Sequence, residues 1–181
     1  MAERIVYVLF AGVLVALTVA GLVGAARASN AQGPSMRPTW VRVAVLVWLG
    51  ALVFMTVRPG NGRGVRLQLT PFVVDGPGSA FDAVLNVAVF VPPGILLASI
   101  GWRLLAVLAA ALATSLSVEV VQYLTDWGRT ADVNDLLTNV AGAALGWVVA
   151  RVIVWSRSRD AAPPGNNSTE PTSEARATLE R

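Results

Sequence analysis

Apolar residues run along this chain in long stretches and do not recur at the short periods typical of soluble helices or strands. Five stretches are long enough to cross a bilayer as helices, and these are Ile5–Gly24, Val41–Val57, Phe81–Ile100, Arg103–Leu124 and Asp132–Trp155. The predicted fold is therefore all-α, a polytopic transmembrane helix bundle of about five spans.

Turn-forming residues interrupt this pattern at two informative places. Pro92 and Pro93, followed by Gly94, lie in the middle of the third predicted helix. Two prolines remove two backbone donors, so we expect a kink or a break there, with protein groups or water satisfying the freed carbonyls. Gly101 and Trp102 leave room only for a very tight turn before the fourth helix.

The composition fits a membrane protein and excludes several kinds of site. Of 181 residues, 55% are hydrophobic and 14% are charged, and the basic residues are 14 arginines without a lysine. Most arginines flank apolar stretches, which indicates headgroup contacts and topology signals and not a nucleic-acid surface. The chain has no cysteine and no histidine. Disulfides, thiolate or histidine metal sites and Ser-His-Asp triads are therefore excluded.

Polar residues concentrate between and inside the last two helices, where ionisable groups are costly and usually functional. The candidate catalytic residues there are Glu119, Asp132 and Asp135. The candidate binding residues, which add amides and one arginine, are Asn86, Glu119, Gln122, Arg129, Asp132, Asp135 and Asn139. Ser115, Glu119 and Gln122 share one face of the fourth helix, and Asp132, Asp135 and Asn139 share one face of the fifth.

Each of these residues also has a purely structural interpretation. Arg129 would pair with Glu119 or Asp132, and Asp132 would cap the fifth helix. Gly142 and Gly146 would let a neighbouring helix approach closely, and the Pro92-Pro93-Gly94 kink would have no further purpose. The structural interpretation is favoured for most of them taken alone. Function is favoured at Glu119, because a carboxylate inside a helix is costly to keep without use.

A short sequence occurs twice. Residues 82–88 and 135–141 both read D-x-x-x-N-V-A, and each is predicted to open a helix. Two such helices running in the same direction would bring Asp82 and Asn86 to the same membrane level as Asp135 and Asn139.

These residues together resemble the VanZ-like membrane proteins of bacteria. The motif N-x-x-x-F-x-P-x-G occurs at 86–94, E-x-x-Q at 119–122, and R-x-x-D-x-x-D-x-x-x-N-x-x-G at 129–142; Thr70-Pro71-Phe72 also fits. Pro93 departs from the family pattern, which has an aliphatic residue there. The resemblance implies a VanZ-like membrane domain with four helices at 41–155, preceded by an extra N-terminal transmembrane helix at 1–27. The polar residues 157–181 have no apolar face and are predicted to form a disordered tail. The resemblance also implies a role at the cell envelope, through the family's association with teicoplanin resistance.

Three functions fit the site. The leading hypothesis is binding: a polar cleft of carboxylates, Arg129 and amides holds a lipid-linked or peptidoglycan-related headgroup and modulates envelope chemistry or glycopeptide and lipoglycopeptide resistance. The alternative is a membrane-embedded enzyme, with Glu119, Asp132 and Asp135 as acid and base or as ligands of a hard divalent cation such as Mg²⁺. The second alternative is a small proton- or ion-coupled transporter. The sequence requires no cofactor and specifies no oligomeric state.

Arginine positions predict the orientation in a bacterial plasma membrane. Seven arginines flank helix ends on the side of the C-terminal tail: Arg27, Arg37, Arg42, Arg103, Arg151, Arg157 and Arg159. Five lie on the other side: Arg4, Arg58, Arg63, Arg66 and Arg129. The positive-inside rule then makes the tail cytoplasmic and the candidate site extracytoplasmic. Ala26-Arg27-Ala28 matches a signal-peptide cleavage pattern, and cleavage there would invert this orientation; the long apolar run before it favours a spanning helix.

Overall fold

The computed structural model describes residues 2–28, 39–57, 66–71, 77–125 and 130–160. They form five helices and two short strands: α1 (Ala2–Ala28), α2 (Thr39–Thr56), β1 (Arg66–Gln68), α3 (Pro77–Ser99), α4 (Leu104–Thr125), β2 (Thr130–Asp132) and α5 (Val133–Asp160). All five helices are long and apolar enough to cross a membrane. The prediction of an all-α, membrane-spanning bundle is confirmed, with a strand pair that was not predicted.

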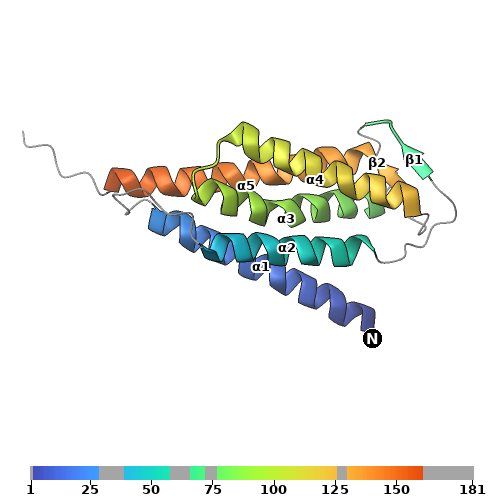
Figure 1. The fold of residues 1–181 in the computed structure, drawn as a ribbon, viewed down its shortest axis with the longest axis horizontal. Helices are drawn as coiled ribbons and strands as arrows, with labels where there is room; N and C mark the ends of the chain where they lie inside the picture. Colours follow the sequence, from blue (N-terminus) through green and yellow to red (C-terminus); the bar gives the residue numbers. More distant parts are fainter. Residues whose placement is uncertain (1, 29–38, 58–65, 72–76, 126–129, 161–181) are drawn as a thin grey trace, which may run out of the picture.

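Helix α3 lies at the centre of the bundle (Figure 1). Its most extensive contact is with α5, and α4 also packs on α5. α1 and α2 cover another side of α3, and α1 also packs on α5. α2 and α4 scarcely touch each other. The bundle is therefore not closed between α2 and α4.

The boundaries of α3 and α5 differ from those predicted, and the earlier start of α3 changes the position of Asp82 in its helix. α3 begins at Pro77, four residues before the predicted start, with proline at the first helical position where its missing N–H costs nothing. Asp82 therefore lies in the second turn of α3 and is exposed, so its expected place at the helix start is wrong. α5 continues to Asp160, about one turn beyond Trp155. The rest of the predicted tail lies outside the described residues.

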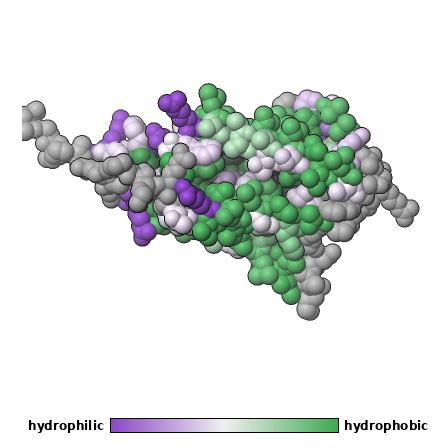
Figure 2. All heavy atoms as spheres, in the orientation of Figure 1, coloured by the Kyte–Doolittle hydropathy of each residue, from purple (hydrophilic) through white to green (hydrophobic). Residues whose placement is uncertain are grey.

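The bundle is apolar outside and partly polar inside. Large apolar side chains on the helices face outward, and Leu105 is 79% exposed. Figure 2 shows this hydrophobic surface along the middle of the molecule, with hydrophilic residues gathered at one end. Inside, Ser115, Glu119, Gln122 and Asn139 are buried together with the apolar core. This inversion is expected where lipid replaces water around the helices.

The two ends of the bundle have different chemistry. The arginine end is where α1, α3 and α5 finish and α2 and α4 start, and its described arginines are Arg27, Arg42, Arg103, Arg151, Arg157 and Arg159. The strand end carries β1, β2, the last turn of α4 and the first turns of α3 and α5. The candidate residues on α4 and α5 lie toward the strand end.

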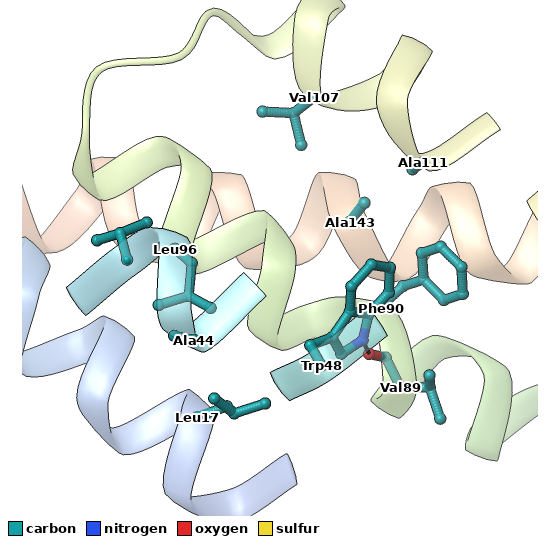
Figure 3. Packing of buried hydrophobic residues seen from close by; sticks show 10 residues of the cluster. Leu17, Ala44, Trp48, Val89, Phe90, Leu96, Val107, Ala111 and Ala143 are labelled. Atoms are coloured by element: carbon teal, nitrogen blue, oxygen red, sulfur yellow. Dashed lines mark hydrogen bonds between the residues drawn. The ribbon is translucent and has the colours of Figure 1, made fainter. Parts of the chain in front are cut away.

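Helix α3 passes through Pro92 and Pro93 without ending, so the expected break does not occur. Pro93 lies four residues after Val89 and cannot donate to the Val89 carbonyl, as a helical N–H would. The indole N–H of Trp48 on α2 donates to that oxygen instead, at 2.8 Å (Figure 3). Trp48 also meets Phe90 edge to face, with ring centroids 5.2 Å apart. The carbonyl freed by Pro93 is therefore satisfied from a neighbouring helix, which is the condition expected for a proline in lipid.

The tight turn between α3 and α4 is confirmed. Gly101 has a φ of 84°, the left-handed conformation that glycine adopts without strain. Its N–H donates to the Ala98 carbonyl, and the Trp102 N–H donates to the Leu97 carbonyl. This pair of bonds is the Schellman motif, and it lets α4 start within five residues of the end of α3.

Candidate functional site

The site rests on a close, parallel contact between α3 and α5. A Cβ atom at Gly142 would meet the Val87 carbonyl oxygen, and one at Gly146 would meet the Val91 carbonyl oxygen. From the opposite side, a Cβ at Gly94 would meet the carbonyl oxygen of Ala143. Only glycine fits at these three positions, because backbone lies directly against backbone.

This contact sets the levels of the two Asn residues. Gly142 faces Val87 and Gly146 faces Val91. Residue numbers therefore rise in the same direction along both helices, so α3 and α5 are parallel. Asn86 and Asn139 each lie within one turn of the first glycine contact. The D-x-x-x-N-V-A motifs are therefore brought to neighbouring levels, as their repetition predicted, with Asn139 buried and Asn86 half-buried.

Helix α4 presents its polar face to the interior. Ser115, Glu119 and Gln122 are 0%, 9% and 7% exposed, while Leu116 and Val120 between them face outward. On a leucine- and alanine-rich helix in lipid, burying a carboxylate and an amide is unfavourable unless protein groups form hydrogen bonds with them. Together with Asn139, these three residues form what we call the polar cluster.

Asn139 links α5 to α4 and has unused hydrogen-bonding capacity. Its amide Nδ2 donates to the Ser115 hydroxyl at 2.8 Å, and both side chains are buried. Its Oδ1 atom is buried and has no hydrogen-bond partner among the described residues. A buried acceptor without a donor costs about 1–3 kcal/mol. If the amide is rotated so that Oδ1 faces Ser115, the NH₂ group takes the same unpartnered place.

Glu119 is held by the start of α5. Its Oε2 accepts a hydrogen bond of 2.8 Å from the backbone N–H of Asp132, the residue just before α5. The carboxylate thus lies at the N-terminal end of α5, where the helix dipole favours negative charge. Its predicted partner Arg129 lies outside the described residues, so the expected ion pair stays a prediction.

Asp132 caps α5, as predicted. Its Oδ1 accepts from the backbone N–H of Asn134 at 2.8 Å and from the Asn134 amide at 3.0 Å. A side-chain oxygen that receives the N–H of the second helical residue is the usual N-cap arrangement. The Asn134 amide also contacts the Thr70 carbonyl oxygen at 3.5 Å, which places the loop after β1 beside the start of α5.

A parallel strand pair joins these loops. β1 pairs with β2 in the register Arg66 with Thr130, Leu67 with Ala131 and Gln68 with Asp132. Ala131 is buried at 3% exposure, whereas Leu67 is exposed. The strand pair therefore fixes the segment that supplies both the N–H for Glu119 and the cap of α5.

The other predicted residues divide between this site and its surroundings. Asp135 is half-buried in the first turn of α5, and it makes further polar contacts. Among the described residues, no group of three or more carboxylate side chains surrounds a common point that would suit a metal ion. Glu119 faces a backbone N–H and Asp132 faces Asn134, so the carboxylates accept hydrogen bonds separately. The arrangement is rich in acceptors and suits a ligand that carries hydrogen-bond donors.

Two contributors were missed from the sequence. Asn134 holds the Asp132 cap and reaches the Thr70 loop, and its signal was the position two residues after a predicted N-cap. Trp48 satisfies the carbonyl freed by Pro93, and its signal was a lone indole donor in an apolar helix near a double proline.

Comparison with known proteins gives one match. The sequence model of the family described as VanZ/LLP1 matches residues 7–154, which include most of α1 as well as α2 to α5. No curated protein and no solved structure matches the chain. The division of 1–27 from 41–155 stays a prediction.

Proposed function

This chain belongs to the VanZ/LLP1 family of membrane proteins, and from that premise we propose that it binds an envelope component at the strand end. The proposed ligand is the sugar or peptide portion of a lipid-linked or peptidoglycan-related headgroup. Binding would reduce the action of glycopeptide or lipoglycopeptide antibiotics such as teicoplanin. The polar cleft is proposed to face the outer leaflet of a bacterial plasma membrane.

The observation that carries this proposal is the unpartnered Oδ1 of Asn139 inside the polar cluster. Beside it lies Ser115, and one turn further along α4 lies Glu119, whose carboxylate is already oriented by Asp132. Sugar hydroxyls and peptide groups both donate and accept hydrogen bonds, so they suit Asn139 in either amide orientation, and their donors suit the Glu119 carboxylate. A phosphate has no donors and would be repelled by Glu119, Asp132 and Asp135, so the uncharged part of the headgroup fits better.

The orientation is proposed from charge. Described arginines number six at the arginine end, against Arg4 and Arg66 at the strand end. The positive-inside rule makes the arginine end cytoplasmic, and the polar cluster then opens toward the outer surface, where an envelope ligand is found.

The test is teicoplanin susceptibility of cells that express the full chain, with protein abundance measured in parallel. Glu119→Gln keeps an oxygen that can accept from the Asp132 N–H while removing the charge, so it separates function from folding. We expect Glu119→Gln and Asp135→Asn to lose resistance at normal abundance. Asp82→Asn is the matched control, because Asp82 is an exposed carboxylate at the same end and is not one of the candidate binding residues.

Two outcomes would contradict the proposal. If cells expressing the unchanged chain are as susceptible as cells without it, the resistance role fails. If Glu119→Gln and Asp135→Asn protect as well as the unchanged chain, these carboxylates do not act in that role. Loss of the protein itself in both variants would show that they are needed only for the fold.

A further inference from the structure

A cavity runs from the arginine end toward the middle of the bundle. It lies between α2 and α4, over the C-terminal half of α3, and its volume of about 420 Å³ is within the size range of small-ligand sites. Its wall includes small residues on facing helices: Gly94 on α3, Ala110 and Ala111 on α4 and Ala143 on α5. Because these side chains do not fill the space between α2 and α4, a hollow remains in an otherwise packed bundle.

The cavity is apolar along its length and charged at one end. Trp48 and Phe90 close its inner part, where both are buried. Figure 3 shows these two rings on one side of Ala143, with Val107 and Ala111 of α4 on the other side. Arg42 lines the cavity near the start of α2 and is exposed. Arg42 and Leu49 both line it and are seven residues apart, so the cavity extends about 10 Å along α2.

Tryptophans mark the headgroup level at this end. Trp40, Trp102, Trp147 and Trp155 all lie at the arginine end, and the Trp147 indole donates to the Trp102 carbonyl at 2.9 Å. Tryptophan gathers where bilayer meets water. Arg42 lies two residues after Trp40, about 3 Å deeper, from where a long arginine side chain reaches a lipid phosphate. The cavity therefore starts at headgroup level and runs into the hydrocarbon region.

We infer that this cavity binds one acyl chain of an anionic glycerophospholipid, whose phosphate pairs with Arg42. An apolar hollow inside a bilayer accepts a hydrocarbon chain, and charge decides which lipid supplies it. The arginine end carries six described arginines against one described carboxylate, Asp160. Of these arginines, Arg42 lines the cavity, and an arginine beside an anionic lipid contributes about 1 kcal/mol. The choline of a zwitterionic lipid offsets this attraction, so an anionic headgroup is selected at Arg42.

The test is native mass spectrometry of the purified full chain in detergent, with phosphatidylglycerol or phosphatidylcholine of identical acyl chains. We expect one tightly retained phosphatidylglycerol and weaker retention of phosphatidylcholine. Arg42→Gln should weaken retention of phosphatidylglycerol about fivefold, the factor that corresponds to 1 kcal/mol. It should weaken phosphatidylcholine less, because the choline cation already offsets the attraction of its phosphate to Arg42. Arg27→Gln is the matched control, because Arg27 is exposed at the same end on α1 and does not line the cavity.

A second variant tests the cavity itself. Ala110→Leu places a larger side chain in the hollow from a half-buried position on α4, and it should reduce retention of both lipids while the melting temperature is kept. Equal retention of the two lipids by the unchanged chain would overturn the inference. So would equal losses in Arg27→Gln and Arg42→Gln, which would indicate diffuse attraction. A dimer that phosphatidylglycerol does not displace and that Ala110→Leu abolishes would instead assign the cavity to a second copy of the chain.

Discussion

Replacement of Trp48 by Phe should destabilise the bundle, because it leaves the backbone carbonyl of Val89 without its hydrogen-bond donor. The substitution keeps an aromatic ring beside Phe90 but removes the indole N–H that donates to Val89 at 2.8 Å. Trp48 is 4% exposed and Val89 is 9% exposed, so water does not readily replace the lost donor. Pro93 has no N–H to restore the helical bond. An unsatisfied buried carbonyl costs about 1–3 kcal/mol in soluble proteins.

In a membrane, loss of the hydrogen bond itself contributes less to this free-energy cost than it does in a soluble protein. Interhelical hydrogen bonds in membrane bundles average about 0.6 kcal/mol in double-mutant cycles and reach about 1.7 kcal/mol. Pro93→Ala supplies an N–H four residues after Val89, so Trp48→Phe should be milder in that background. Because both partners are buried, we expect a coupling free energy of about 1 kcal/mol, in the upper half of that range.

The measurement is equilibrium unfolding of the purified chain in mixed micelles, followed by far-ultraviolet circular dichroism for both single variants and the double variant. Trp102→Phe is the control, since the Trp102 indole nitrogen is buried and has no acceptor among the described residues. Its replacement should cost only packing. A coupling below about 0.3 kcal/mol, the usual additivity error, would show that Trp48 and Pro93 act independently and would refute the compensation argument.

Three further outcomes are expected. Gly146→Ala should lower the free energy of unfolding by about 2 kcal/mol or more, because its Cβ would meet the Val91 carbonyl; Gly50→Ala, with nothing within 4 Å, should be neutral or stabilising in the same unfolding titration. Asp132→Ala should cost about 0.5–2 kcal/mol through loss of the N-cap, and a melting curve equal to that of the unchanged chain would contradict that role. In intact cells, a membrane-impermeant maleimide should label Thr70→Cys and not Asp160→Cys, since the chain has no other thiol; the reverse pattern would place the polar cluster on the cytoplasmic side.

The features predictable from the sequence are those encoded within one helix or one turn. Apolar length identified the five spans, Gly101 marked the turn after α3, and Asp132 marked the start of α5. Each depends on neighbouring residues only. The same local reasoning placed Ser115, Glu119 and Gln122 on one face of α4, and the structure buries that face.

The features that could not be predicted depend on tertiary packing. The sequence could not indicate the hydrogen bond from the Asp132 backbone N–H to Glu119, because a backbone donor carries no side-chain signal. The predicted pairing of Arg129 with Glu119 or Asp132 stays a prediction. The strands β1 and β2 are three residues each, too short for an alternating pattern to be recognised. The two prolines were expected to kink or break α3, with other groups satisfying the freed carbonyls; the helix does not end there. The donor for Val89 could not be named from the sequence, because Trp48 lies 41 residues away.

The pairing of β1 with β2 bears on how the chain is made. β1 emerges from the ribosome before α3, whereas its partner strand follows α4, 64 positions later in the register of Arg66 with Thr130. Chains fold from the N-terminus as they are synthesised, so α1, α2 and α3 enter the bilayer while β1 still lacks a partner. The hydrogen bond between Glu119 and the Asp132 N–H likewise waits for the segment that β2 provides. A chain truncated after α4 would therefore retain four membrane-inserted helices and an unfinished strand end, with the buried carboxylate of α4 lacking its partner at the start of α5. The polar cluster is therefore completed only when the start of α5 has been synthesised.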